Sequence, residues 1–243
     1  MTRAPLSDQR QLIDLQRLDS QIARLVHERR NLPVLARIEA TVEALRSNKR
    51  DAVVAAAALA EARREATRAD DEVSQVVRRA AALRERLSSG TVGARDLTAI
   101  QGEIDQLGRR QGVLEEAQLA AMEALEGAQA ESERIAQAEQ DVRVRGRELT
   151  AQRDAEFARI DAELAQARSH RDALAATVPA ALLAEYDDVR RSTGGLGAVA
   201  LYGRRVDGPV EVSPQEHARV AAAPADEVIH AEDNDVILVR MED

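Results

Sequence analysis

An apolar residue recurs at every seventh position between Ile38 and Leu87, in a segment otherwise rich in Arg, Asp and Glu. A strict seven-residue apolar repeat places one stripe along an under-wound α-helix, and that stripe must be buried against another helix. The segment therefore predicts a coiled coil. The eight residues of this column are Ile38, Leu45, Ala52, Leu59, Ala66, Val73, Ala80 and Leu87. The heptad spacing predicts a second, more polar column made of Leu35, Val42, Lys49, Ala56, Arg63, Asp70, Val77 and Arg84.

A Ser/Gly-rich stretch at residues 88–93 interrupts the repeat, and two serines with two glycines can end a helix and reverse the chain. Beyond it, the apolar spacing resumes at Leu97 and continues to Leu149. It then slips by one residue before Phe157, a stutter that relaxes the supercoil locally. Two arms of similar length joined by a short turn favour an antiparallel hairpin within one chain, and a dimer of straight arms is the alternative.

The N-terminal helix is expected to begin near Leu6, with Ser7 as its N-cap and Asp8 in the favourable first turn. Pro33 lacks a backbone donor, so a kink is expected near residues 31–34. These elements predict a first domain, residues 1–178, that is a long antiparallel coiled-coil hairpin with its turn near residues 88–94.

Composition agrees with long helices rather than with one large core. The 243 residues include only 3 aromatic side chains, 12 glycines and 6 prolines. Charge is unevenly spread: residues 1–90 carry a net +4, residues 91–178 a net −6 and residues 179–243 a net −7. Opposite charges suit two arms that lie side by side. No window is apolar enough to span a membrane and no apolar signal core opens the chain, which makes the cytoplasm the expected compartment.

The pattern changes after Pro179. Residues 180–191 read as a short amphipathic helix, and Gly194 to Gly197 form a flexible joint. Ser213-Pro214 predicts a brief helix through about Ala222. Short strands are predicted at Ala198–Tyr202, Val210–Val212, Glu227–His230 and Val236–Val239. Residues 179–243 are therefore predicted to form a small α+β domain, so the fold class is mainly α with a small mixed domain at the C-terminus.

This order of parts resembles a bacterial family of coiled-coil hairpin proteins with a C-terminal C4-type zinc ribbon. The resemblance rests on the hairpin region with Arg95-Asp96-Leu97 and Glu103-Ile104, on the Gly194–Gly197 joint, and on the tail from Gly203 to Arg240. It implies a zinc-ribbon-like tail and a binding role. Proteins of the resembling family are associated with an alternative sigma factor, with flagellar or secretion machinery, and with RNA.

The chain departs from that family at the metal site. The resemblance implies two Cys-x-x-Cys knuckles, but the chain contains no cysteine, and the matching positions hold Val206, Pro209, Ala231 and Asn234. A site of four thiolates would supply much of the folding energy of so small a ribbon. We therefore expect a metal-free, ribbon-like domain held together by its apolar residues or by a partner, with no cofactor.

Few groups in the sequence suggest chemistry. The cluster His230, Glu232, Asp233, Asn234 and Asp235 could hold a hard cation, but an acidic turn between strands explains it better. The four histidines are scattered and no catalytic arrangement is indicated, with His27 and His170 expected on the coil surface. Arg204 and Arg205 beside Tyr202 could contact a phosphate or a base, and a salt-bridge role within the tail is the favoured alternative.

The sequence favours a non-catalytic adaptor or chaperone-like protein that binds a protein partner through the coiled coil and the C-terminal domain. The candidate partner-binding residues are Arg95, Asp96, Tyr202, Arg204 and Arg205. The alternative is a regulator that binds RNA or DNA through the basic first arm. The identity of the partner and the oligomeric state stay open.

Overall fold

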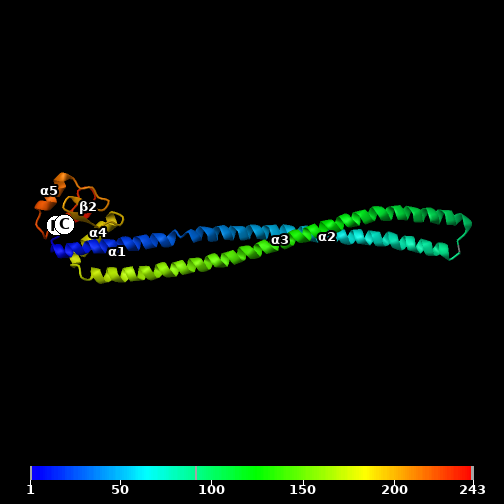
Figure 1. The fold of residues 1–243 in the computed structure, drawn as a ribbon, viewed down its shortest axis with the longest axis horizontal. Coiled ribbons are helices and arrows are strands. Elements are labelled where there is room, and N and C mark those ends of the chain that lie inside the picture. The colour runs from blue at the N-terminus through cyan, green and yellow to red at the C-terminus, as the bar shows by residue number, and fades with distance from the viewer. Residues whose placement is uncertain (1, 91, 242–243) are drawn as a thin grey trace. The chain divides into compact units, whose positions relative to one another are not determined.

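The structure, a computed structural model, describes residues 2–90 and 92–241, with the side chains of residues 94 and 95 excepted. The protein is mainly helical, with a long helical hairpin and a small C-terminal sheet, as the sequence predicted (Figure 1). The helices are α1 (Leu6–Arg30), α2 (Pro33–Ser88), α3 (Ala94–Ala175), α4 (Ala180–Ser192) and α5 (Pro214–Ala222). The strands are β1 (Ala198–Tyr202), β2 (Arg205–Asp207), β3 (Ile229–His230) and β4 (Ile237–Met241).

The chain divides into two compact units. One comprises residues 36–150, and the other comprises residues 1–35 together with residues 151–243. The second unit is therefore built from both ends of the chain. The predicted domain boundary at residue 178 stays a prediction.

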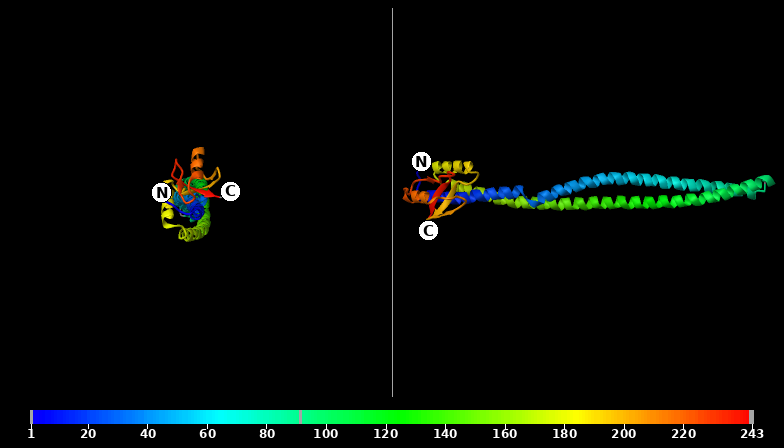
Figure 2. Two further views of the ribbon diagram at one scale, coloured as in Figure 1. Left: turned by 90° about the vertical axis from the view of Figure 1, so that its left-hand side faces the viewer. Right: turned by 90° about the horizontal axis from the view of Figure 1, so that it is seen from above.

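Residues 36–150 form an antiparallel pair of helices, α2 and α3, which lie side by side in two views (Figures 1 and 2). Two contacts show that the helices are antiparallel: Arg79 with Glu103, and Asp70 with Gln118. The residue number falls along α2 as it rises along α3. At the turn, Leu83 packs with Ile100 and Ile104 in a small apolar cluster. Folding within one chain is therefore the arrangement of the structure.

The predicted apolar column faces the partner helix, since every member from Ile38 to Leu87 is buried or half-buried. The predicted second column is wrong, because all of its members after Leu35 are exposed, Val42 and Val77 among them. The second contact row lies one residue earlier. It consists of Val34, Thr41, Asn48, Ala55, Ala62, Ala69, Val76 and Leu83, all buried or half-buried. Small side chains in this row let the two backbones approach closely.

The expected pairing of a basic arm with an acidic arm occurs at individual ion pairs, Arg29 with Asp161 among them, but many described pairs lie within one helix. Within residues 36–150, described ion pairs such as Arg68–Glu65 and Arg134–Glu131 lie three or four residues apart on one helix, and Arg79–Glu103 joins the two helices. Neighbours on one helix turn are closer than groups on opposite sides of a seam, which explains the preference.

The other unit is organised around a four-stranded sheet with strand order β2-β1-β4-β3. β1 runs parallel to β4, and the two outer strands are antiparallel to their neighbours. Alternate residues of the central strands point to opposite faces. Ala198, Ala200, Ile237 and Val239 pack with α1 and α4, while Val199, Leu201 and Leu238 pack with Val220 of α5. The sheet is therefore buried on both faces, as its uniformly apolar central strands require.

The N-terminal segment belongs to this sheet-containing unit. Arg3 forms a β-bridge with Glu227, and the Ala4 N–H donates to the Asp226 carbonyl at 2.8 Å. Leu12 and Leu15 of α1 are fully buried in the core beside α4. The predicted N-cap is wrong, because α1 begins at Leu6 after Pro5, and the Ser7 hydroxyl bonds to Asp8.

Local predictions in the tail are mixed. Ser213 caps α5, accepting a hydrogen bond from the Glu216 N–H at 3.1 Å as its Ser-Pro signature indicated. Val210–Val212 is not a strand; Val210 is buried and packs under the sheet from an irregular segment. β2 was missed because it has only three residues. Its partner β1 begins where predicted.

Candidate interaction surfaces

The hairpin leaves a completely apolar stretch of α2 partly uncovered. Residues 52–60 are nine consecutive apolar residues, and six of them are exposed. Val53 and Val54 are 71% and 70% exposed. A helix that is apolar on all sides is normally buried on all sides. Here α3 covers only the side that carries Ala55 and Leu59.

Two grooves flank a close approach of the same two helices near Thr41. The Cβ position at Gly146 lies 3.5 Å from the Thr41 methyl group, so small side chains meet here. On one side, a groove of about 600 Å³ is lined by Ile38, Val42 and Leu45 of α2 and by Val142 of α3, with Arg143 and Arg147 also lining it. A second groove of about 350 Å³ includes Arg37 and Arg145 in its lining.

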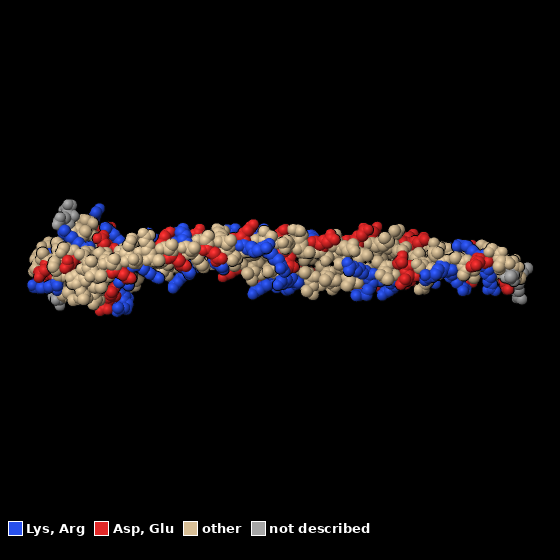
Figure 3. All heavy atoms as spheres, turned by 90° about the horizontal axis from the view of Figure 1, so that it is seen from below, with Lys and Arg blue, Asp and Glu red and all other residues tan. Residues whose placement is uncertain are grey.

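Charged side chains of both signs cover the face shown in Figure 3. Along the hairpin, Lys and Arg gather toward the lower edge of this view and Asp and Glu toward the upper edge. Several arginines of α2 are engaged by carboxylates: Arg46 and Arg50 by Glu43, and Arg64 by Glu61. These carboxylates oppose the approach of a phosphate backbone.

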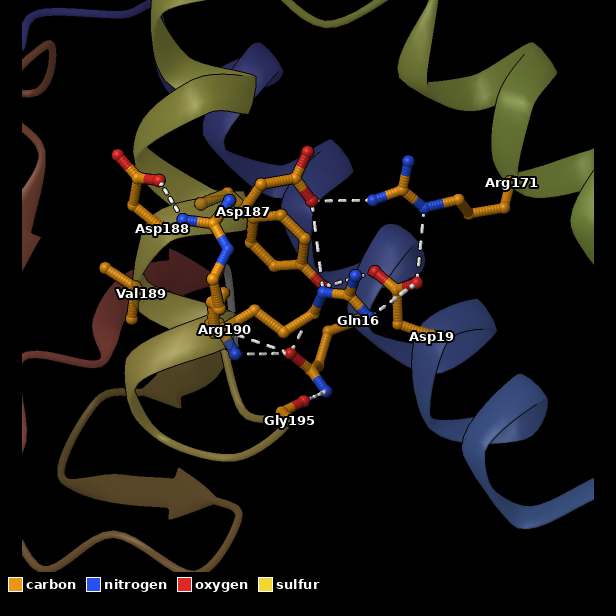
Figure 4. Close-up of polar contacts among 12 residues, drawn as sticks. Gln16, Asp19, Arg171, Asp187, Asp188, Val189, Arg190 and Gly195 are labelled. Carbon is orange, nitrogen blue, oxygen red and sulfur yellow. Dashed lines mark hydrogen bonds and ion pairs between the residues drawn. The ribbon is translucent and has the colours of Figure 1, made fainter. Parts of the chain in front are cut away.

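In the sheet-containing unit, a buried polar cluster connects α1, α3 and α4 (Figure 4). The Asp19 carboxylate is 4% exposed and accepts from Arg171 Nε at 3.2 Å and from the Tyr186 hydroxyl at 2.9 Å. Arg190 approaches the same carboxylate at 3.2 Å, and Arg171 also binds Asp187 at 2.7 Å. Burial, together with the negative charge of Asp19, raises the pKa of Tyr186, so the hydroxyl stays a donor.

Gln16 extends this cluster to the glycine joint. Its amide nitrogen donates to the Gly195 carbonyl at 3.0 Å, and its amide oxygen accepts from the Gly197 N–H at 2.6 Å. A Cβ at Gly197 would lie 2.3 Å from the Tyr186 ring, so only glycine fits beside this ring. The joint that the sequence suggested to be flexible is thus held by hydrogen bonds and packing. The cluster fixes where β1 starts.

The four positions that the resemblance matched to zinc ligands lie as two pairs in the structure. Val206 and Ala231 belong to the same apolar cluster beneath the sheet, and Pro209 and Asn234 line one groove. Apolar packing thus occupies part of this region. Among residues 2–90 and 92–241, no group of three or more His, Asp or Glu side chains is arranged to hold a metal ion.

His230 was considered with the acidic turn, but the structure gives it a different neighbour. Its Nε2 lies 2.8 Å from Glu185 Oε1 of α4, and its Nδ1 lies 2.7 Å from the Asp235 carbonyl oxygen. This pair connects the 231–235 turn to α4. The contact was not foreseen, because nothing in the sequence relates two residues that are 45 positions apart.

The predicted partner-binding residues fall at separate places. Tyr202 and Arg205 face each other across the β1–β2 pair, with the Arg205 guanidinium 5.3 Å from the ring centroid. Arg204 is exposed in the turn between them, and neither arginine forms an ion pair within the described chain, so the salt-bridge expectation is wrong. Asp96 is exposed in the first turn of α3, and the side chain of Arg95 lies outside the described residues. As expected, His27 and His170 are exposed on the hairpin helices.

A comparison with protein families assigns the hairpin. The model of the CT398-like coiled coil hairpin domain matches residues 15–194, which is most of the chain. The chain belongs to this family. An uncharacterized protein of Mycobacterium tuberculosis, Rv2229c, is 33% identical over 242 residues, which cover 99% of this chain and 98% of that protein. Neither the description of this family nor the name of Rv2229c is that of an enzyme.

Solved structures show the same fold. A protein from Mycobacterium smegmatis is 30% identical, with a TM-score of 0.80 over 98% of this chain and all of that one. CT398 from Chlamydia trachomatis has a TM-score of 0.63 at 14% identity, with 97% and 98% of the two chains covered. HP0958 from Helicobacter pylori has a TM-score of 0.52 at 12% identity, with 99% and 100% covered. At such low identity the last two establish the fold alone.

No helix in the described parts of the chain unites the length and the apolar character that crossing a bilayer demands.

Proposed function

We propose that this protein is a non-catalytic, cytoplasmic adaptor that holds a protein partner on the exposed side of its helical hairpin. The observation that carries the proposal is the all-apolar stretch at residues 52–60, six of whose nine residues face solvent. Exposed apolar surface that is continuous along an element is typical of protein interaction sites. The C-terminal domain, with Tyr202, Arg204 and Arg205 at the β1–β2 turn, offers a second contact.

Nucleic-acid binding through the first arm is the less favoured function. The arginines of α2 share their surface with carboxylates, as Arg64 does with Glu61 and Arg46 with Glu43. Binding of RNA or DNA requires a surface on which cations prevail over anions.

Affinity purification from the native cell, with and without nuclease, tests the adaptor proposal. We expect a protein captured in stoichiometric amount that survives nuclease treatment. Val54→Glu should abolish that capture, whereas Val144→Glu, a similar change on the exposed side of α3, should leave it intact. Capture that disappears with nuclease would support the nucleic-acid function instead. If Val54→Glu leaves capture unchanged, the partner does not bind the stretch at residues 52–60.

A further inference from the structure

We infer that the groove between α2 and α3 at Thr41 and Gly146 binds an amphipathic helix of a partner protein whose apolar stripe is flanked by Asp and Glu. The inference rests on the proposed adaptor function: it adds a second contact on the hairpin, separate from the stretch at residues 52–60, and gives that contact a partner chemistry. Its basis is the juxtaposition of an apolar groove floor with arginines that line the groove.

Two small residues face each other across the seam beside the groove. A Cβ built on Gly146 would lie 3.5 Å from the Thr41 methyl group, which is ordinary van der Waals contact. Larger apolar side chains on either side of this contact, Ile38 and Leu45 among them, are left only half-buried. Ile38, Val42 and Leu45 stand at positions i, i+4 and i+7 of α2, which is the spacing that a third helix can meet.

The charges around the groove favour an acidic partner. Arg143 and Arg147 lie one helical turn apart along α3 and both line the groove. Arg143 is engaged by Glu139, but Arg147 forms no ion pair within the described chain. Residues 37–50 and 139–150 together carry seven Lys or Arg and five Asp or Glu, a local excess of positive charge in a chain of net charge −9. Carboxylates beside an incoming apolar stripe would reach these arginines.

The opposite side of the seam repeats the arrangement. Arg37 and Arg145 line the smaller groove together with Val142 and Leu149. Neither arginine forms an ion pair within the described residues. The larger groove is the better site, because its lining contains Val42, which is 44% exposed. A partner can therefore contact Val42 without displacing a side chain of this chain.

A synthetic peptide tests this assignment on the full chain. The probe is an amphipathic helix of about 18 residues, five turns, with Leu at i, i+3, i+4 and i+7 and Glu on both flanks. A second peptide keeps the leucines and replaces each Glu by Lys. Fluorescence anisotropy of the labelled peptides is expected to show saturable binding of the Glu peptide, and binding of the Lys peptide at least about tenfold weaker.

Matched variants locate the binding. Val42→Glu places a carboxylate in the groove and should weaken the Glu peptide about tenfold or more. Val144→Glu changes an exposed valine on α3 that lines neither groove, and its effect should stay within about twofold. Arg147→Glu should weaken binding, while Arg110→Glu, a similar change far from the groove, should not. Far-UV circular dichroism checks that each variant keeps its helices.

The inference is overturned by any of three results: equal binding of the two peptides, no binding at about 1 mM peptide, or equal effects of Val42→Glu and Val144→Glu. Self-association of the chain that Val42→Glu abolishes would also overturn it, because a second copy would then occupy the groove. If nuclease-resistant capture of a protein persists in Val42→Glu, the adaptor function stands and only this groove is excluded.

Discussion

Removing the Asp19 carboxylate should destabilise the sheet-containing unit far more than removing a carboxylate one turn away. Asp19 is 4% exposed and accepts from Arg171, Arg190 and Tyr186 at 3.2, 3.2 and 2.9 Å. Asp19→Ala leaves two guanidinium groups, 19% and 36% exposed, without this partner. Breaking a buried ion pair from one side costs about 3–5 kcal/mol. Because both arginines retain some solvent and Asp187, we expect a loss of about 3 kcal/mol.

Asp14→Ala is the matched control. Asp14 lies on the same helix and is 61% exposed, and its ion-pair partner among the described residues is Arg17, three positions away. Exposed pairs of this kind contribute less than about 1 kcal/mol, so this variant should stay within about 0.5 kcal/mol of the parent.

Urea unfolding followed by tyrosine fluorescence measures both effects. The chain has two tyrosines, Tyr186 and Tyr202, and both lie in the sheet-containing unit, so the signal reports that unit. The expected result is a lower urea midpoint for Asp19→Ala with little change for Asp14→Ala. Equal midpoints for the two variants, or a parent-like midpoint for Asp19→Ala, would refute the reasoning.

Three further predictions concern packing and titration. Gly197→Ala should lower the free energy of unfolding by about 1–3 kcal/mol in the same urea assay, because its Cβ would overlap the Tyr186 ring. Gly112→Ala has open space around it and should raise the thermal midpoint of the hairpin. Leu59→Asp should cost about 2 kcal/mol by thermal melting in far-UV circular dichroism, while Val53→Asp on the exposed side should not; equal melting curves would contradict the heptad alignment. The raised pKa of Tyr186 contributes stability that is complete below its unfolded pKa of about 10 and is lost as pH rises above it. In a Tyr202→Phe variant, tyrosinate absorbance should therefore appear only as the fold is lost, and early ionisation would speak against a buried hydroxyl.

The regular part of this fold was readable from the sequence because a seven-residue repeat has one simple solution. Even there, the second contact row was predicted one residue away from its position in the structure. The row at Leu35 contains four charged residues, whereas the row at Val34 contains none. That absence of charge is the signal that could have located the seam, and it identifies alanines as contact residues despite their small size.

The sheet-containing unit was predictable only in outline. The apolar runs at β1 and β4 predicted buried strands, and Ser213-Pro214 predicted α5. The bridge between Arg3 and Glu227 and the contact between His230 and Glu185 have no local signature. Both depend on which segments the completed fold brings together, and no spacing along the chain encodes this.

The interaction surfaces were missed for a related reason. Val42 was placed in the predicted second column, and the sequence alone does not say which side of α2 a single partner helix leaves open. A glycine inside a helix indicates only weak helix formation, and the position of Gly146 opposite Thr41 depends on the pairing of the helices.

The bridge at Arg3 has a consequence for how the protein is made. About 220 residues separate the two partners, so closing that loop carries a large entropic cost until other contacts share it. During synthesis, the apolar side of α1, with Leu12 and Leu15, cannot be buried until β4 leaves the ribosome. In contrast, α2 and α3 can pair as soon as both have emerged. A nascent chain that stalls before Ile237 would therefore expose the apolar side of its first helix, which holdase chaperones can bind.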